Sequence, residues 1–483
     1  MQLPLLSRPA ILLAFLAMSV YGQSYDIVIS RARVVDPESK TDSVRDVGIT
    51  GSRITGLSAK PLSGKRVIDG RGLVLAPGFI DLHWHGVDPA SDAYELHDGV
   101  TTSLELEIGV KDIDAYYKAR DGKSLIHHGA AAGHAPVRME VLGDSGDFLP
   151  ADKASFGRAT EEDVAKMKMR LEQEFKKGAV ALGLGIVYTQ GASYWEIIEM
   201  FKLAARFNAV CHVHLRGASS AVSAENGRIQ GLSEVIAAAA ITGASLHVVH
   251  INSSSQASIT RMMEMIEGAR KAGIDVTTEA YPYTAGATRI ESAVFDGVES
   301  RPDSYFSNMQ WVKTGERLTR ETFLKYRKER GLVITHSNTE ENVRKAITHP
   351  LVMIASDGFD VTSGGHPRSA GTFTKILRQH VRDEKAIPLM DAIAKMTIMP
   401  ARRLEKRVPS MKNKGRIKVG ADADLVLFDP AMVRDRATYE KPDAFAEGVK
   451  VAIVNGVVAL ADGKVVEGVH PGKAIRAAVV ADK

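Results

Sequence analysis

Between about residues 76 and 405, short apolar runs typical of β-strands alternate with amphipathic stretches typical of helices. The strand-like runs include "TTSLELEIG", "VALGLGIVY", "AVCHVHL", "SLHVVHI", "DVTTEAYPY", "GLVIT" and "LVMIASDG". The helical stretches between them include "EDVAKMKMRLEQEFKKG" and "YWEIIEMFKLAARFN". Nearly continuous apolar strands separated by helices indicate a parallel sheet covered on both sides. Because about eight such units close into a barrel, we predict an α/β fold containing a (β/α)8 TIM-like barrel.

A different texture flanks this segment at both ends of the chain. Residues 23–75 and 406–483 contain short alternating runs such as "YDIVIS", "ADADLVLFD" and "VAIVNGVVAL", separated by Gly and polar turns. Because both ends of the chain have this strand-like pattern, we predict that they form a single composite β-sandwich domain. Residues 291–330, rich in charge and aromatic side chains, fit the barrel rhythm poorly and are predicted to form an insertion over the barrel mouth.

The first 22 residues have the features of a secretory signal peptide. A basic residue, Arg8, precedes an apolar run from Ala10 to Tyr21, and a cleavage site is expected after Gly22. The run is too short to cross a bilayer, so no membrane span is expected after cleavage, although an uncleaved anchor is the alternative. We therefore expect an exported protein, periplasmic or extracellular. Cys211 is the single cysteine, which excludes an internal disulfide.

The charge balance argues against macromolecular polyanions as partners. The chain has 62 Lys and Arg against 58 Asp and Glu, and the basic residues are dispersed. Without a basic stripe, neither nucleic acid nor an anionic membrane surface is an expected partner. The expected partner is a small molecule. The sequence does not determine the oligomeric state, and a homo-oligomer is one of the states that it allows.

Polar residues gather where the predicted barrel strands end, the edge at which such barrels carry their chemistry. His83 and His85 follow "GFIDL", and because they are two apart on a strand both can face one ion. His214, His250 and Asp357 end three other runs. Histidine and carboxylate ligands of this kind suit Zn²⁺ and leave a position for water. We therefore predict a site for one or two divalent ions.

These motifs resemble the amidohydrolase superfamily. The His-x-His pair, the later single histidines, the "SDG" aspartate and the tail "KGRIKVGADADLVLFDP" carry that likeness. Within the superfamily, "DGVTT", "GLGIVYTQG", "HVHLRG", "YPYTAG", "ASDG" and "GGHPRSAGTF" are similar to segments of the N-acyl-D-amino-acid deacylases. The similarity extends from about residue 25 to 460. It implies a barrel with a composite β-sandwich and metal-dependent hydrolysis of an N-acylated D-amino acid.

The resemblance also implies roles for individual residues. His83 and His85 would form one metal position, and His214 and His250 the other. Asp357 would be both a metal ligand and the carboxylate that carries a proton from water to the leaving amine. The same proton transfer is expected from general principles, because a carboxylate beside an activated water can move its proton.

The chain departs from the deacylase pattern at one ligand position. The family generally has a metal-binding cysteine in a "GNCG" segment after "GVTT", where this chain has "LELEIG". We predict that Glu107, nearer the strand end, bridges the metal positions, with Glu105 supporting it from behind. Buried hydrogen bonds or salt bridges made by both glutamates are the alternative. No lysine ends the "ALGLGIVY" strand, so a carbamylated lysine is not expected as the bridge.

A second departure concerns the substrate. The family places a basic residue two positions after the histidine that corresponds to His250, and this chain has Asn252 there. We predict that Arg368 binds the substrate carboxylate through two parallel hydrogen bonds, helped by Tyr188, Tyr283 and Asn252. Arg216 and Arg289 are further candidates. Two alternatives stay open: hydrolysis of a cyclic amide, dipeptide or ester, and a catalytically dead secreted binding protein.

Overall fold

The computed structural model describes residues 24–86, 88–217, 224–361 and 365–480. Its centre is an eight-stranded parallel sheet in the order β16-β12-β11-β10-β9-β8-β7-β6. The strands are β6 (Phe79–Asp81), β7 (Val100–Val110), β8 (His127–Gly133), β9 (Leu182–Gly185), β10 (Val210–His214), β11 (Ser245–Val248), β12 (Val276–Ala280) and β16 (Val352–Ile354).

Contacts just beyond the two edge strands bring the ends of this sheet together. The backbone N–H of Ser356 donates to Oδ1 of Asp81 at 3.0 Å, and that of His85 donates to the carbonyl of Gly358 at 2.8 Å. These bonds join the segment after β16 to the segment after β6. The predicted barrel fold is confirmed.

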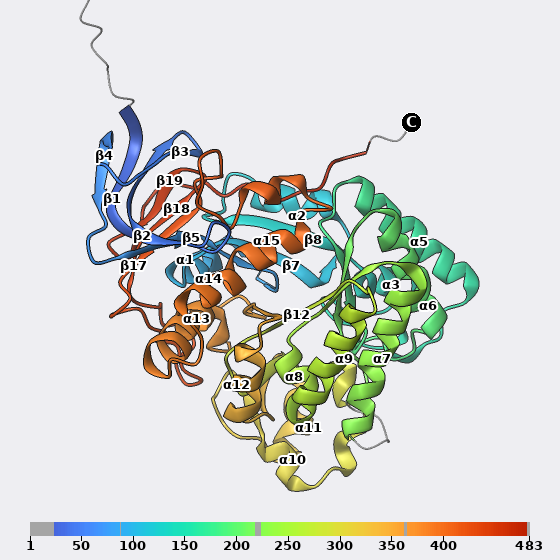
Figure 1. Cartoon of the computed structure of the whole chain (residues 1–483). Helices are drawn as coiled ribbons and strands as arrows, with labels where there is room; N and C mark the ends of the chain where they lie inside the picture. Colours follow the sequence, from blue (N-terminus) through green and yellow to red (C-terminus); the bar gives the residue numbers. More distant parts are fainter. Residues whose placement is uncertain (1–23, 87, 218–223, 362–364, 481–483) are drawn as a thin grey trace, which may run out of the picture.

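Most of the α-helices lie around the barrel, whereas α10 and α11 belong to the segment between β12 and β16 (Figure 1). The α-helices are α1 (Asp92–His97), α2 (Ile113–Arg120), α3 (His134–Leu142), α4 (Lys153–Phe156), α5 (Glu161–Lys176), α6 (Tyr194–Arg206), α7 (Ala224–Thr242), α8 (Ile251–Ser255), α9 (Ile259–Lys271), α10 (Asp303–Ser307), α11 (Arg320–Glu329), α12 (Glu340–Thr348), α13 (Arg368–Lys375), α14 (Leu389–Met396) and α15 (Ile398–Leu404). Helix α5 shows why they form: Thr160 and Asp163 make a reciprocal capping box. Met167, Leu171 and Phe175, spaced by four, are fully buried against the barrel.

Both chain ends contribute to a second domain, the β domain. Its sheet has nine strands: β1 (Ser24–Asp36), β2 (Thr41–Thr50), β3 (Arg53–Ser58), β4 (Ser63–Asp69), β5 (Val74–Pro77), β17 (Leu425–Phe428), β18 (Val449–Val454), β19 (Val457–Ala461) and β20 (Lys464–Val465). Strand β17 pairs antiparallel with β5, which joins the N-terminal and C-terminal halves. Figure 1 shows β1–β4, in blue, beside β17–β19, in orange and red. The predicted composite β domain is confirmed as a part of the fold.

A buried charge cluster ties the β domain to the barrel. Oδ1 of Asp424, just before β17, accepts a hydrogen bond from Nε2 of His127 on barrel strand β8 at 2.9 Å. Its Oδ2 accepts one from Nζ of Lys414 at 2.5 Å. Beyond β20 the chain returns to the barrel, where the backbone N–H of Ile475 donates to the carbonyl of His128 at 2.7 Å. The last residues described therefore pack on the barrel rather than within the β domain.

One predicted barrel strand was wrong. The run "GLVIT" lies in β15 (Leu332–His336), which pairs antiparallel with β13 (Ala285–Arg289) and β14 (Met309–Trp311) in a separate three-stranded sheet. The barrel strand that the sequence analysis omitted is β8, "HHGAAAG", whose small residues lack the β-branched texture of its neighbours. The segment that departs from the barrel alternation extends over 285–336, longer than the predicted 291–330.

The predicted signal peptide, residues 1–22, lies outside the described residues. Among the helices of the described part of the chain, none combines the length and the apolar character that a membrane crossing needs.

Candidate metal centre

Titratable side chains converge at the carboxyl ends of the barrel strands. His83 and His85 follow β6, Glu107 lies near the end of β7, and His214 ends β10. His250 lies two residues after the end of β11 and Asp357 three residues after the end of β16, and both have positive φ angles, 31° and 54°. Non-glycine residues adopt such angles rarely, and strain of this kind gathers at functional sites.

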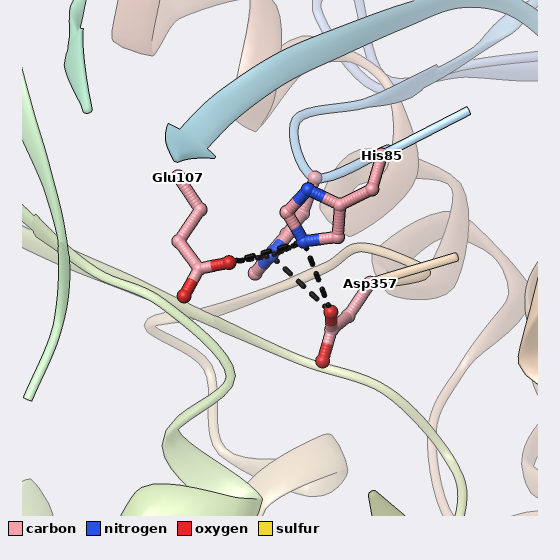
Figure 2. Close-up of side chains that lie close together, drawn as sticks. His85, Glu107 and Asp357 are labelled. Atoms are coloured by element: carbon pink, nitrogen blue, oxygen red, sulfur yellow. Dashed lines mark hydrogen bonds and ion pairs between the residues drawn. The ribbon is translucent and has the colours of Figure 1, made fainter. Parts of the chain in front are cut away.

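One group of ligand atoms consists of Nε2 of His83, Nε2 of His85, a carboxylate oxygen of Glu107 and one of Asp357. These atoms all lie within 4.8 Å of one another. Oε2 of Glu107 is 3.0 Å from Nε2 of each histidine, and Oδ1 of Asp357 is 3.3 Å and 3.4 Å from the same two nitrogens. Figure 2 shows His85, Glu107 and Asp357 pointing toward one another.

The other oxygen of Glu107 belongs to a second group with His214 and His250. Oε1 of Glu107 contacts Nδ1 of His214 and lies 3.9 Å from Nε2 of His250. The two histidine nitrogens are 3.3 Å apart. A single carboxylate thus faces two adjacent sets of histidines, one with each oxygen.

Three of the histidines have a hydrogen-bond partner on Nδ1, the nitrogen that faces away from the other ligand atoms in His83 and His85. Nδ1 of His83 donates to Oε1 of Glu279 at 2.7 Å, and Nδ1 of His85 donates to Oε2 of Glu105 at 2.7 Å. His250 uses its Nδ1 with the hydroxyl of Ser253 at 3.1 Å. When these rings are neutral, a proton on Nδ1 of His83 and of His85 leaves the lone pair on Nε2, the nitrogen that faces the other ligand atoms.

Glu279 on β12 was missed by the sequence analysis. It is buried and also accepts a hydrogen bond from Nε2 of His247 at 3.0 Å. The available signal was the carboxylate in the apolar run "DVTTEAYPY", because a buried glutamate needs a partner. Glu105, predicted to support Glu107, lies behind His85 in the structure, and the backbone N–H groups of Ile108 and Gly109 also donate to it.

The electrostatics of the cluster favour a positive charge at its centre. Burial opposes a charge on His83, but the carboxylates of Asp357 and Glu107 outweigh it and raise its pKa to about 10. Burial also opposes ionisation of Glu107, yet His214 and the other histidines hold its pKa well below the usual range. A cluster whose central carboxylate stays ionised although it is buried is suited to a cation.

A cavity of about 320 Å³ opens onto this cluster. His85, Glu107, His214, His250 and Asp357 are among its lining residues. The insertion supplies much of the opposite wall, including Thr288, Arg289, Val294, Phe295 and Met309.

Two of the predicted substrate-binding residues line the cavity and two do not. Tyr188 and Arg368 do, and the Tyr188 hydroxyl lies 3.1 Å from that of Thr288. Tyr283 instead donates to the carbonyl of Pro367 at 3.3 Å. The amide of Asn252 donates to the carbonyl of Tyr281 at 3.1 Å and accepts from its backbone N–H. The prediction that Tyr283 and Asn252 contact the substrate therefore lacks support, because backbone groups of the barrel mouth already engage both side chains.

Arg368 forms an ion pair with Asp357 at the edge of the ligand cluster. Its Nη1 lies 2.9 Å from Oδ2 of Asp357, the oxygen that does not face the histidines. The guanidinium is buried over the rings of Tyr281, at 4.8 Å, and Phe359, at 5.6 Å. Burial raises the pKa of a carboxyl group, but Arg368 and His83 reverse the shift, so the pKa of Asp357 lies below its usual range. Arg216 is engaged elsewhere, with Glu234 at 2.6 Å.

A parallel barrel with histidines and carboxylates converging at its strand ends defines the class of metal-dependent barrel hydrolases. The chain belongs to the amidohydrolase family, whose sequence model matches residues 74–466. It is 28% identical over 478 residues to an N-acyl-D-glutamate deacylase of Alcaligenes xylosoxydans xylosoxydans, covering 90% of this chain and 93% of that protein. It is 26% identical over 489 residues to a D-aminoacylase of the same organism, covering 90% and 94%.

Solved structures have the same fold. The crystal structure of N-acyl-D-glutamate deacylase from Bordetella bronchiseptica, complexed with zinc and a phosphonate inhibitor, superposes with a TM-score of 0.79 at 24% identity. The match covers 94% of this chain and all of that one. A D-aminoacylase structure gives a TM-score of 0.80, also at 24% identity, with the same coverage.

Proposed function

We propose that the protein hydrolyses N-acyl-D-amino acids to a carboxylate and a free D-amino acid at a divalent metal centre. The observation that carries the proposal is the pair of ligand groups that share Glu107 at the floor of one cavity. Family membership and the names of the two curated relatives support the same reaction.

The residues present fit a metal. Four imidazoles and two carboxylates form a mixed nitrogen and oxygen donor set, which suits Zn²⁺, and the zinc complex of the Bordetella deacylase supports that choice. His83, His85 and Asp357 would hold one ion, His214 and His250 the other, with Glu107 between them. A bound divalent ion supplies a lower pKa for water and polarises the amide carbonyl.

The chain's own residues would manage the proton and the substrate's orientation. Asp357 accepts a proton from the attacking water and returns it to the amine nitrogen as the C–N bond breaks. Arg368, beside it, binds the carboxylate of the amino acid half, which keeps that nitrogen within reach of Asp357. Arg289 lines the same cavity and is placed to attract a second carboxylate, as in glutamate or aspartate.

The test is an assay of amine release by the purified protein. N-acyl-D-glutamate, N-acyl-D-aspartate and N-acyl-D-methionine are compared with their L-enantiomers, a cyclic amide and a dipeptide. We expect one or two divalent ions per chain, release of D-amino acids, loss of activity on exhaustive chelation and recovery with Zn²⁺. Ring opening or dipeptide cleavage without D-acyl activity would replace the proposed substrate. Full activity after chelation would remove the metal from the reaction.

We also propose that the protein is exported. The support is the basic Arg8 followed by the apolar run from Ala10 to Tyr21. N-terminal sequencing of the mature protein from a periplasmic or culture fraction checks this, with a new terminus at Gln23 as the expected result.

A further inference from the structure

The cavity has one strongly apolar side, which we call the apolar wall. Its buried residues are Ile108, Leu149, Val187 and Tyr188, with Phe148 and Val294 packed against them. All of these except Val187 line the cavity. Phe148 is only half-buried, so part of its ring is free to cover a ligand.

The apolar wall and the proton-carrying aspartate lie on opposite sides of the barrel mouth. Asp357 and Arg368 follow β16, whereas Val187 and Tyr188 follow β9. In the sheet order, β9 is four strands from β16, which is half of the eight-stranded circuit. Ile108 lies near the end of β7 and Leu149 follows β8, so all of the wall except Val294, which comes from the insertion, lies on the β7 to β9 side.

The cationic side of the cavity lies near Asp357. Arg368, the first residue of α13 after β16, pairs with Asp357 at 2.9 Å and lines the cavity. The cavity therefore has a side with Asp357 and Arg368 and a facing side of aliphatic and aromatic carbon.

The loop that carries Phe148 and Leu149 is fixed by one carboxylate. Oδ1 of Asp144 accepts hydrogen bonds from the backbone N–H groups of Gly146 at 2.8 Å and Ala151 at 2.9 Å. Its Oδ2 accepts from Ala154 at 2.7 Å. A loop held at both ends presents its apolar side chains in one arrangement, which reduces the ordering cost of binding.

The chemistry of amide hydrolysis orients the substrate between these two sides. Water adds to the carbonyl carbon, the C–N bond breaks, and the proton passes through Asp357 to the departing nitrogen. The amine half must then lie beside Asp357 and Arg368, so the acyl chain extends across the cavity toward the β7 to β9 side.

We infer that the apolar wall is an acyl subsite and that the preferred substrates carry an apolar acyl group longer than acetyl, either a linear alkyl chain or an aryl-alkyl group. This inference rests on the proposed deacylase function and specifies the chemical character of the acyl half of the substrate. Each methylene of the acyl chain that packs against the apolar wall is removed from water. The preference of the enzyme for longer acyl chains should therefore increase until the chain covers the wall.

The experiment compares N-acetyl, N-butyryl and N-hexanoyl derivatives of one D-amino acid with the zinc-loaded protein. We expect kcat/KM to rise about three- to fourfold per added methylene, the factor for one buried CH₂. Phe148→Ala and Leu149→Asn should each flatten the hexanoyl-to-acetyl ratio. The ratio is measured within one preparation, so a partly unfolded variant does not distort it.

Leu324→Asn is the matched control, because Leu324 is 40% exposed on α11 and is not among the residues that line the cavity. It should keep the wild-type ratio. Deacylation that is equal for all three chains, or fastest with acetyl, overturns the acyl subsite and leaves the deacylase intact. A chain-length preference that survives both wall variants also overturns it. Hydrolysis of none of the three compounds rejects the deacylase itself, and the subsite with it.

Discussion

Asp357→Asn is expected to lower kcat by about 10³-fold while leaving the metal content nearly unchanged. The amide has the same shape but cannot accept a proton from water, and loss of a general acid–base group costs up to about 10⁴-fold. The substitution suits the backbone, because Asp357 has φ 54° and asparagine tolerates that region well. Steady-state kinetics and elemental analysis of the same preparation measure both quantities.

The Asp357→Asn substitution also removes the ion pair with Arg368, so a control variant is needed for that loss. Arg368 loses its partner in Asp357→Asn, so some thermal stability should be lost as well. Asp92→Asn makes the same change at another buried pair, Asp92 with Arg120 at 2.5 Å, away from the residues that line the cavity. It should lose stability but keep kcat. Retained turnover in Asp357→Asn would remove the proton-transfer role from Asp357.

Glu107→Gln is expected to empty the metal centre, whereas Glu105→Gln should only weaken it. Oxygens of Glu107 contact His83, His85 and His214, so no other carboxylate can take its central place. Among the candidate ligands Glu105 contacts the Nδ1 of His85 alone, and removal of such an outer partner typically costs about 10- to 100-fold in affinity or activity. The loss in Glu107→Gln should exceed that range.

Dialysis against a graded series of chelator concentrations, followed by elemental analysis, ranks the two variants. Each substitution replaces Glu by Gln, so side-chain volume is matched. If Glu105→Gln released the ions at lower chelator concentration than Glu107→Gln, the bridging role would belong to Glu105.

Much of the fold could be predicted from the local alternation of apolar and polar residues. The errors arose where similar apolar runs lie in different surroundings, or where a buried strand has a weak strand signal. Runs such as "AVCHVHL" are continuous because both faces of a barrel strand are buried. The run "GLVIT" looks the same, yet it forms β15 of the insertion sheet. One face of this strand packs against the small local core of the insertion rather than inside the barrel. Strand β8 was missed because alanine and glycine carry little strand signal.

The candidate metal ligands could be predicted because they lie at the ends of recognisable strands. The residues that hydrogen-bond to these ligands from distant strands could not be predicted. His83, His85 and Asp357 each follow a recognisable apolar run. The contact of Glu279 with His83 joins residues far apart in the chain, and no spacing rule predicts it. The hydrogen bonds of Asn252 to Tyr281 were unpredictable for the same reason, because Tyr281 follows a neighbouring strand.

The junction of β5 with β17 has a consequence for biosynthesis. Strand β5 ends at Pro77 and its partner begins at Leu425, roughly 350 residues later. At about 5–20 residues per second, that edge waits on the order of 20–70 s for its neighbour while the ribosome completes the barrel. During this interval the edge of β5 that later pairs with β17 has unsatisfied backbone groups, so the β domain cannot be completed until the whole barrel segment has been synthesised.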